Sequence, residues 1–116
     1  MKVSHEQLAD GVVLVRADGR LDAATVETFE GLLQDLLASQ HARLVVDLAH
    51  VDYISSSGLR ALLTARRLAR EQAGDVLVCC MSPRVRQVFD MIGFSSVFGV
   101  YDDLPQAQAA LAAASS

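Results

Sequence analysis

The stretch LVVDLAHVDYISSSGLRALLTARRLAR (Leu44 to Arg70) holds a strand pattern, a serine-rich turn and a helix pattern in direct succession. The short apolar run at Leu44 to Leu48 predicts a buried strand. A helix is expected to begin within Ser55 to Gly58 and to run to about Glu71, where Gly74 would end it. One arc of that helix is apolar and is expected to pack on the sheet: Leu59, Leu62, Leu63, Ala65 and Ala69.

Upstream of this run, two short segments predict a hairpin. Residues 2–8 alternate weakly and Val12 to Val15 is rich in β-branched side chains, with a turn at residues 9–11 between them. A helix is expected to start at Asp22, whose carboxylate can cap free backbone N–H groups. Its apolar residues recur with a helical period: Val26, Phe29, Leu33, Leu36 and Leu37.

Downstream, two further helices carry clear start signals. Ser82 is expected to cap the first of them, with proline at the next position, and Gly93 is expected to end it. The second follows Asp103, and Gln106 three residues on matches a capping box. The first of these helices has one predicted buried face: Val85, Val88, Phe89 and Ile92.

The apolar runs at residues 76–81 and 97–100 predict two more strands. The expected order of elements is therefore β-β-α-β-α-β-α-β-α. This order predicts an α/β fold in which a mixed sheet of about five strands is covered by about four helices. We expect one domain over residues 1–112 and a frayed tail over residues 113–116.

The composition of the chain excludes some classes of binding partner. The chain has 116 residues, of which 52% are apolar and only 5% aromatic, and its formal net charge is −4. A field of that sign repels nucleic acid and anionic membranes, so we expect no direct nucleic-acid partner and no polybasic membrane contact. The N-terminus lacks an apolar targeting segment and no apolar run is long enough to span a bilayer, which predicts a cytoplasmic protein without membrane insertion.

The residue types that hold metals or cofactors lack the required spacing. Cys79 and Cys80 are adjacent in an apolar run, which fits neither a disulfide framework nor a metal clip, so we interpret them as buried strand thiols. His5, His41 and His50 show no metal-ligand spacing. No glycine-rich phosphate loop occurs either. The sequence predicts no metal and no cofactor.

The serine cluster Ser55, Ser56, Ser57 is the main candidate for chemistry. It lacks the G-x-S-x-G elbow of serine hydrolases and no histidine is arranged beside it, so the sequence predicts no catalytic residues and no enzyme. Two interpretations remain open: ordinary cap and turn serines, or a site that receives phosphate, since a helix N-terminus accommodates negative charge. On the opposite side from the apolar arc, Arg60, Thr64, Arg67 and Glu71 form one stripe that faces water or a partner.

Residues 44–70 resemble the signature of the anti-sigma factor antagonist family, the small STAS-domain proteins, in which S-S-x-G-L opens a helix after a strand ending in D-L. Two further stretches are similar to that family in the same order: GRLDAATVETFEGLL at 19–33 and SPRVRQVFDMIGF at 82–94. The similarity spans nearly the entire chain.

The resemblance implies a binding protein that is not an enzyme. Its expected partner is an anti-sigma factor that is also a serine kinase with an ATPase-like fold, which the unphosphorylated form sequesters so that a sigma factor is released. A metal-dependent serine phosphatase resets the switch. Aligned on S-G-L, the phosphoserine of the family falls on Ser56, with Ser55 and Ser57 as alternatives. Well-studied members of the family carry Asp immediately before the phosphoserine, where this chain has Ser55.

The resemblance also places Asp22 at the family's acidic residue near that loop, where it is implicated in partner contact. An alternative within the same fold is an adaptor subunit of a lipid or solute ABC transporter, for which phosphorylation would be irrelevant. The residues expected to bind the partner are Asp22, Ser55, Ser56, Ser57, Gly58, Arg60, Thr64 and Arg67.

Overall fold

The computed structural model describes residues 1–114 and holds a five-stranded mixed sheet with strand order β1-β2-β3-β4-β5. The first strand is antiparallel to the second, and the other neighbours are all parallel. The predicted mixed sheet of about five strands is therefore confirmed. The strands are β1 (Lys2–Gln7), β2 (Val13–Leu21), β3 (Arg43–Ile54), β4 (Asp75–Cys79) and β5 (Val100–Tyr101).

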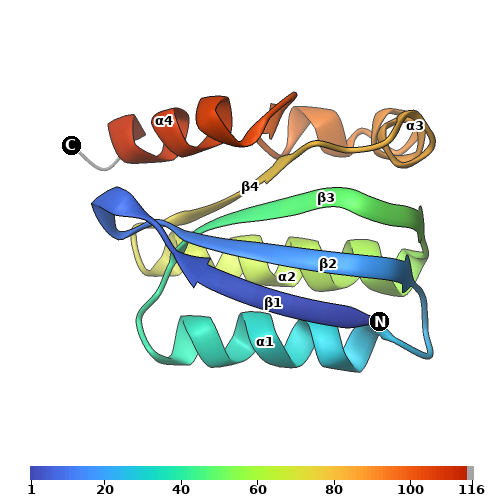
Figure 1. Ribbon diagram of the computed structural model, residues 1–116, viewed down its shortest axis with the longest axis horizontal. Helices are drawn as coiled ribbons and strands as arrows, with labels where there is room; N and C mark the ends of the chain where they lie inside the picture. Colours follow the sequence, from blue (N-terminus) through green and yellow to red (C-terminus); the bar gives the residue numbers. More distant parts are fainter. Residues whose placement is uncertain (115–116) are drawn as a thin grey trace.

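Four α-helices cover the sheet in the predicted order, and one-turn 3₁₀ helices lie between β1 and β2 (9–11) and between α3 and β5 (94–96). Figure 1 shows α4 on one side of the sheet and α1 on the other, with α2 beside α1. The parallel strands are joined by helical crossovers, which is why each predicted helix alternates with a strand. The helices are α1 (Val26–Ala38), α2 (Ser56–Glu71), α3 (Pro83–Met91) and α4 (Leu104–Ala114).

The two faces of the sheet bury two separate apolar clusters. The larger cluster lies under α1, α2 and α3 and contains the two largest buried side chains, Phe29 and Phe89. The smaller cluster lies under α4 and includes Leu14, Val45 and Leu77. Alternate residues of the central strands thus point into different clusters, as the two-residue period of a strand requires.

The start of α1 differs from the prediction. The helix begins at Val26 with Thr25 as its N-cap residue, so Asp22 does not cap it. The Asp22 carboxylate instead accepts a hydrogen bond from the Ala24 N–H at 3.0 Å. The chain makes a turn over residues 22–25 before the helix direction is established, and Asp22 stabilises that turn.

The fifth strand also begins later than predicted. Residues 97–99 are not in a strand, because the N–H groups of Val97 and Phe98 donate to the Phe94 carbonyl and continue a helical turn. Pairing with β4 starts only at Val100. The third strand, by contrast, runs to Ile54, well beyond the predicted end at Leu48, because it pairs with β2 along nearly its whole length.

One leucine and one isoleucine side chain that are predicted to be buried are exposed. Leu63 on α2 is 40% exposed, and Ile92 just after α3 is 48% exposed. Each lies at the margin of its apolar arc, where the helix turns away from the sheet. Sequence periodicity identifies the arc but does not tell how wide a stripe the neighbouring elements cover.

At the C-terminus, α4 runs through Ala114, two residues past the predicted domain end at residue 112. The other two residues of the predicted tail, 115–116, lie outside the described residues. Within the described part of the chain, no helix is both long enough and apolar enough to cross a membrane.

Candidate functional site

Asp22 and the serine cluster lie at one edge of the sheet. Leu21 and Ile54 are paired across β2 and β3, and the next residue of each strand opens a loop. The Ser55 N–H donates to the Leu21 carbonyl at 2.8 Å and joins the two loops. This edge is at the right of Figure 1, where β2 and β3 end and α2 begins. The carboxyl ends of parallel strands are where α/β proteins place their functional loops.

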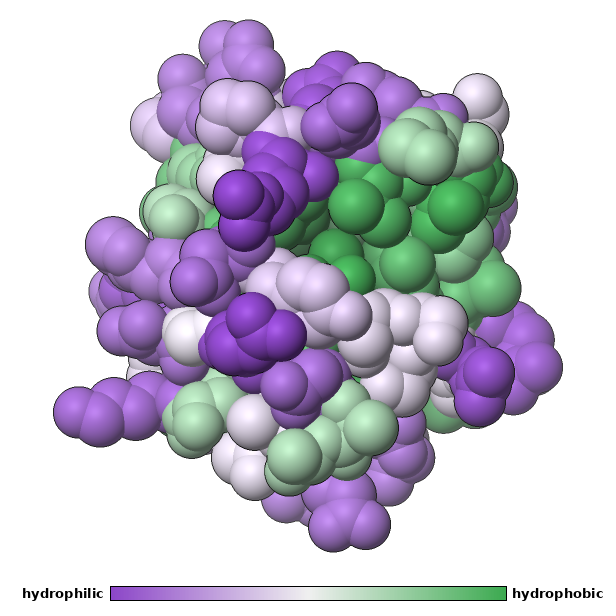
Figure 2. All heavy atoms as spheres, turned by 90° about the vertical axis from the view of Figure 1, so that its right-hand side faces the viewer, coloured by the Kyte–Doolittle hydropathy of each residue, from purple (hydrophilic) through white to green (hydrophobic). Residues whose placement is uncertain are grey.

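Figure 2 looks onto this end of the molecule. Apolar surface gathers in the upper half of the face, and polar side chains surround it. Met91, at the end of α3, is 78% exposed, which is unusual for so large an apolar side chain. The face therefore combines polar surface with exposed apolar area.

The three serines have different environments although they are consecutive. The Ser55 hydroxyl caps α2 by accepting the Gly58 N–H at 3.4 Å, and it lies 2.8 Å from the Ser57 hydroxyl. Both of these side chains are partly buried. Ser56 is exposed, and among the described residues its hydroxyl has no hydrogen-bond partner. Only Ser56 therefore presents an unengaged hydroxyl to solvent at the start of the helix.

Gly58 is buried in the first turn of α2. A Cβ built at this position would lie 2.8 Å from Leu21 Cγ and 3.0 Å from Ile54 Cγ1. The missing side chain thus lets the start of α2 sit directly on the ends of β2 and β3. Gly58 shapes the candidate surface from below and does not itself form its exposed part.

Asp22 is held in place by a set of local contacts. Its carboxylate accepts from the Thr25 hydroxyl at 3.2 Å and lies 3.6 Å from Arg20 Nε. Desolvation by itself raises the pKa of Asp22, but the hydrogen bonds from Ala24 and Thr25 together with Arg20 outweigh it, so the pKa lies below its ordinary value. The Arg20 guanidinium also lies 4.2 Å from the centre of the Tyr53 ring. Asp22 is therefore an ionised and well-positioned acidic group at physiological pH.

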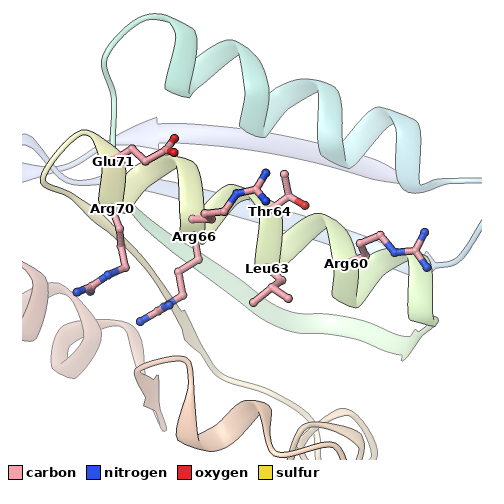
Figure 3. A pocket seen from close by; sticks show the side chains of 7 residues that line it. Arg60, Leu63, Thr64, Arg66, Arg70 and Glu71 are labelled. Carbon is pink, nitrogen blue, oxygen red and sulfur yellow. The ribbon is translucent and has the colours of Figure 1, made fainter.

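The outer side of α2 forms a shallow groove of about 860 Å³. Arg60 and Arg67 are exposed along it and Thr64 is half-buried, which confirms that the predicted stripe faces outward. In Figure 3, Thr64 points toward α1, whereas Leu63 points toward the C-terminal part of the chain. The groove is lined by Arg60, Leu63, Thr64, Arg66, Arg67, Arg70 and Glu71.

Several of these residues were missed by sequence reasoning. Leu63 was assigned to the buried arc, and Arg66 and Arg70 were not singled out. Both arginines pair with Asp75 at the start of β4, at 3.5 and 3.4 Å. The four arginines of α2 are visible in the sequence. The position of Asp75, which brings Arg66 and Arg70 together, is known only from the fold. Arg20 and Tyr53, at the sheet edge, were missed for the same reason.

The start of α2 has the electrostatic properties that favour an anion. The N-terminus of a helix carries unpaired N–H groups and a partial positive charge, both of which favour an anion. Ser56 occupies the first helical position of α2, so a phosphate on its hydroxyl would sit beside these groups. Such a modification changes the charge of the surface between the Asp22 loop and the groove of α2.

Comparisons with known proteins identify the family of the chain. The model of the STAS domain family matches residues 6–107. A protein from Bordetella bronchiseptica, BtrV, whose name describes it as a candidate anti-sigma factor antagonist, is 34% identical over 110 residues, which cover 95% of this chain and 94% of that protein.

Solved structures are similar over comparable lengths. The crystal structure of an anti-sigma factor antagonist from Mycobacterium paratuberculosis is 25% identical, with a TM-score of 0.83, and covers 95% of this chain and 94% of that chain. The phosphorylated form of the Bacillus cell fate determinant SpoIIAA has the same fold at 20% identity, with a TM-score of 0.73 and coverage of 93% of this chain and 96% of that chain.

Proposed function

The chain belongs to the STAS domain family, and from this premise we propose that it is an anti-sigma factor antagonist controlled by phosphorylation. In its unphosphorylated form it binds an anti-sigma factor that is a serine kinase with an ATPase-like fold, and the bound kinase releases its sigma factor. Phosphorylation of Ser56 ends this binding, and a metal-dependent serine phosphatase restores it. The protein acts in the cytoplasm as a binding partner and not as an enzyme.

The observation that carries this proposal is the difference among the three serines. A kinase must reach a hydroxyl and place its oxygen in line with a phosphoryl group. Ser56 is exposed and its hydroxyl is unengaged, whereas the hydroxyls of Ser55 and Ser57 contact each other and are partly buried. Modification of Ser55 would also remove the cap of α2. These contacts favour Ser56 as the acceptor.

Electrostatics explains how one phosphate could act as a switch. Within the domain, a phosphate at the N-terminus of α2 is stabilised by about 0.3–1 kcal/mol, so the fold is kept. In a complex, the same dianion would be buried against a surface that is complementary to a neutral hydroxyl. A buried charge without a partner costs several kcal/mol, and each ~1.4 kcal/mol is a factor of ten in affinity. A loss of about two decades in affinity is expected.

The binding surface that we propose is continuous. It begins at Asp22, crosses the serine cluster and follows α2 along Arg60, Thr64 and Arg67. The first two parts are joined by the hydrogen bond between the Ser55 N–H and the Leu21 carbonyl. The residues of α2 continue this surface because residues three and four positions apart lie on one side of a helix. Gly58 contributes by holding α2 close to the sheet edge.

Binding of the cognate kinase to two Ser56 variants tests the proposal. By isothermal titration calorimetry, Ser56→Ala should bind the kinase as tightly as the unphosphorylated protein, and phosphorylated protein should bind about 100-fold more weakly. Ser56→Asp should fall between them because Asp carries less charge than phosphate.

Ser55→Ala and Ser57→Ala serve as matched controls, since each removes one hydroxyl from the same turn. Equal affinity of the phosphorylated and unphosphorylated proteins would contradict the switch. Binding to a transporter ATPase in place of a kinase would identify the chain as a transporter adaptor.

A further inference from the structure

A cluster of potential metal ligands lies on the other face of the sheet, away from α2. Cys79 ends β4 and is paired with Asp47 on the neighbouring strand β3. Cys80 follows directly. One ligand atom of each of the three residues, two sulfurs and a carboxylate oxygen, lies within 4.8 Å of the others. This cluster is not expected from the sequence, because adjacent residues of a strand point to opposite faces.

The backbone at Cys80 explains why both thiols are on one side. Cys80 has φ of +65°, in the left-handed region that non-glycine residues rarely adopt. Its N–H still donates to the Tyr101 carbonyl at 3.2 Å, so this conformation is anchored to β5. Cys80 thereby packs against the same small apolar cluster that contains Cys79. The interpretation of both residues as strand thiols is corrected: only Cys79 belongs to the strand.

The charges around the cluster favour a bound cation. The Asp47 side chain is only 14% exposed, and its second carboxylate oxygen lies 3.6 Å from Arg16 Nε. A divalent cation bound by two thiolates and a carboxylate, with both thiol protons released to water, would face three negative ligands. Arg16, which also pairs with Glu6, would offset part of the excess negative charge.

We propose that Cys79, Cys80 and Asp47 form a binding site for one thiophilic divalent cation of the Zn²⁺ class. Thiolates and carboxylates bind Zn²⁺ at about 2.3 and 2.0–2.2 Å in tetrahedral geometry, which places two sulfurs about 3.8 Å apart. The ligand atoms need to move by only about 1 Å to reach these distances. Hard cations such as Mg²⁺ and Ca²⁺ prefer all-oxygen sites and are not expected to bind.

Three protein ligands leave one position for water or another ligand. Cys80 is only partly buried, which gives an entry path from the surface. The site is independent of the proposed partner surface, because Asp47 lies in the middle of β3 whereas Ser55 follows the end of that strand. The bound ion would tie β3 to the end of β4, beside the start of α3.

Titration with Co²⁺ under reducing conditions tests this site, because thiolate ligands give Co²⁺ a charge-transfer absorption that water and carboxylates do not. We expect one Co²⁺ per chain, displaced by one equivalent of Zn²⁺. Changes to residues that only support a metal ligand already weaken binding by about 10- to 100-fold. Cys80→Ser and Asp47→Asn, which remove direct ligands, should weaken it by at least as much.

His50→Ala is the matched control, since it removes an exposed imidazole from the same strand without touching the cluster. It should leave the absorption and the affinity unchanged. Circular dichroism of the metal-free variants verifies that each is folded. Absence of the charge-transfer band in the wild-type protein, or an unchanged band in both Cys80→Ser and Asp47→Asn, would overturn the proposal.

Discussion

The helices α1 and α2 cover the same face of the sheet and pack against each other, but they present opposite charges to solvent. The outer side of α1 carries Glu27, Glu30 and Asp35 and no basic residue. The outer side of α2 has a single acid, Glu71, among four arginines: Arg60, Arg66, Arg67 and Arg70. In a chain with net charge −4, four of the ten basic residues therefore lie on this one helix.

This difference separates what the fold needs from what a partner needs. The inner sides of both helices are aliphatic and contribute to one core, so packing alone would allow either helix to be acidic or basic outside. Only α2 begins at the serine cluster and continues from it as a basic groove. We infer that α1 serves the fold and that α2 serves both the fold and recognition.

The largest expected effect is on the free energy of unfolding, when a glycine of α2 or of α1 is replaced by alanine. A Cβ at Gly58 on α2 would meet Leu21 at 2.8 Å, whereas a Cβ at Gly31 on α1 would meet nothing within 4 Å. Gly58→Ala should lower the free energy of unfolding by about 1–3 kcal/mol through overpacking. Gly31→Ala should raise it by about 0.5–1 kcal/mol, because alanine is the better helix former. Urea denaturation measures both, and a stabilising Gly58→Ala would contradict the packing at the sheet edge.

The second effect concerns binding. Arg67→Glu should weaken the complex with the kinase about tenfold, or ~1.4 kcal/mol, because it reverses a charge in the middle of the groove. Its thermal midpoint should hardly change, since exposed charges contribute little to stability. Asp35→Arg on α1 is the matched control and should leave the affinity unchanged. Equal binding by Arg67→Glu and wild type would remove the groove from the interface.

The third effect is on the start of α2. Ser55→Ala removes the hydroxyl that accepts the Gly58 N–H, and it should cost about 1 kcal/mol of stability. Ser55→Asp should be nearly neutral because Asp is an equally good cap, which also explains how the family can carry Asp at this position. Thermal unfolding of both variants measures the difference. A larger loss in Ser55→Asp than in Ser55→Ala would show that the contact with Ser57 matters more than the cap.

The smallest effect is the pH dependence contributed by Asp22, at the turn before α1. Its pKa is lowered in the folded protein, so its contribution to stability is present above the unfolded pKa of about 3.9 and is lost as the pH falls through the folded value. Asp22→Asn should therefore unfold at lower urea concentration than wild type at pH 7. The difference in the urea midpoint between the two proteins should disappear below pH ~4. A difference that stays constant down to the lowest pH would show that the carboxylate charge is irrelevant.

Much of the fold follows from the sequence because its signals are local. The end of α2 at Glu71 and the capping of α3 by Ser82 and of α4 by Asp103 are confirmed. The bounds that fail depend on distant pairing: the length of β3 is set by β2, and the late start of β5 by a helical turn at Phe94. Gly74 was expected to end α2, and the left-handed residue that follows the helix is Ala73.

Gly74 is required for another reason, since a Cβ there would lie 2.0 Å from the Ala42 carbonyl oxygen.

The candidate site was predictable to a similar degree. The helical period is enough to predict that the stripe on α2 faces outward. Arg66, however, joins the groove through its ion pair with Asp75. The neighbours of Cys80 depend on the left-handed backbone angle at that residue. Contacts between residues far apart in the sequence, and left-handed residues other than glycine, leave no local pattern to detect.

Phosphopeptide mass spectrometry tests the central claim most directly. The protein is incubated with ATP and the cognate kinase, and the modified residue is mapped within the peptide that contains Ser55, Ser56 and Ser57. We expect a single phosphate on Ser56 in the wild-type protein and none in Ser56→Ala. Phosphate on Ser55 or Ser57 in the wild-type protein, or no phosphate on any of the three, would contradict it.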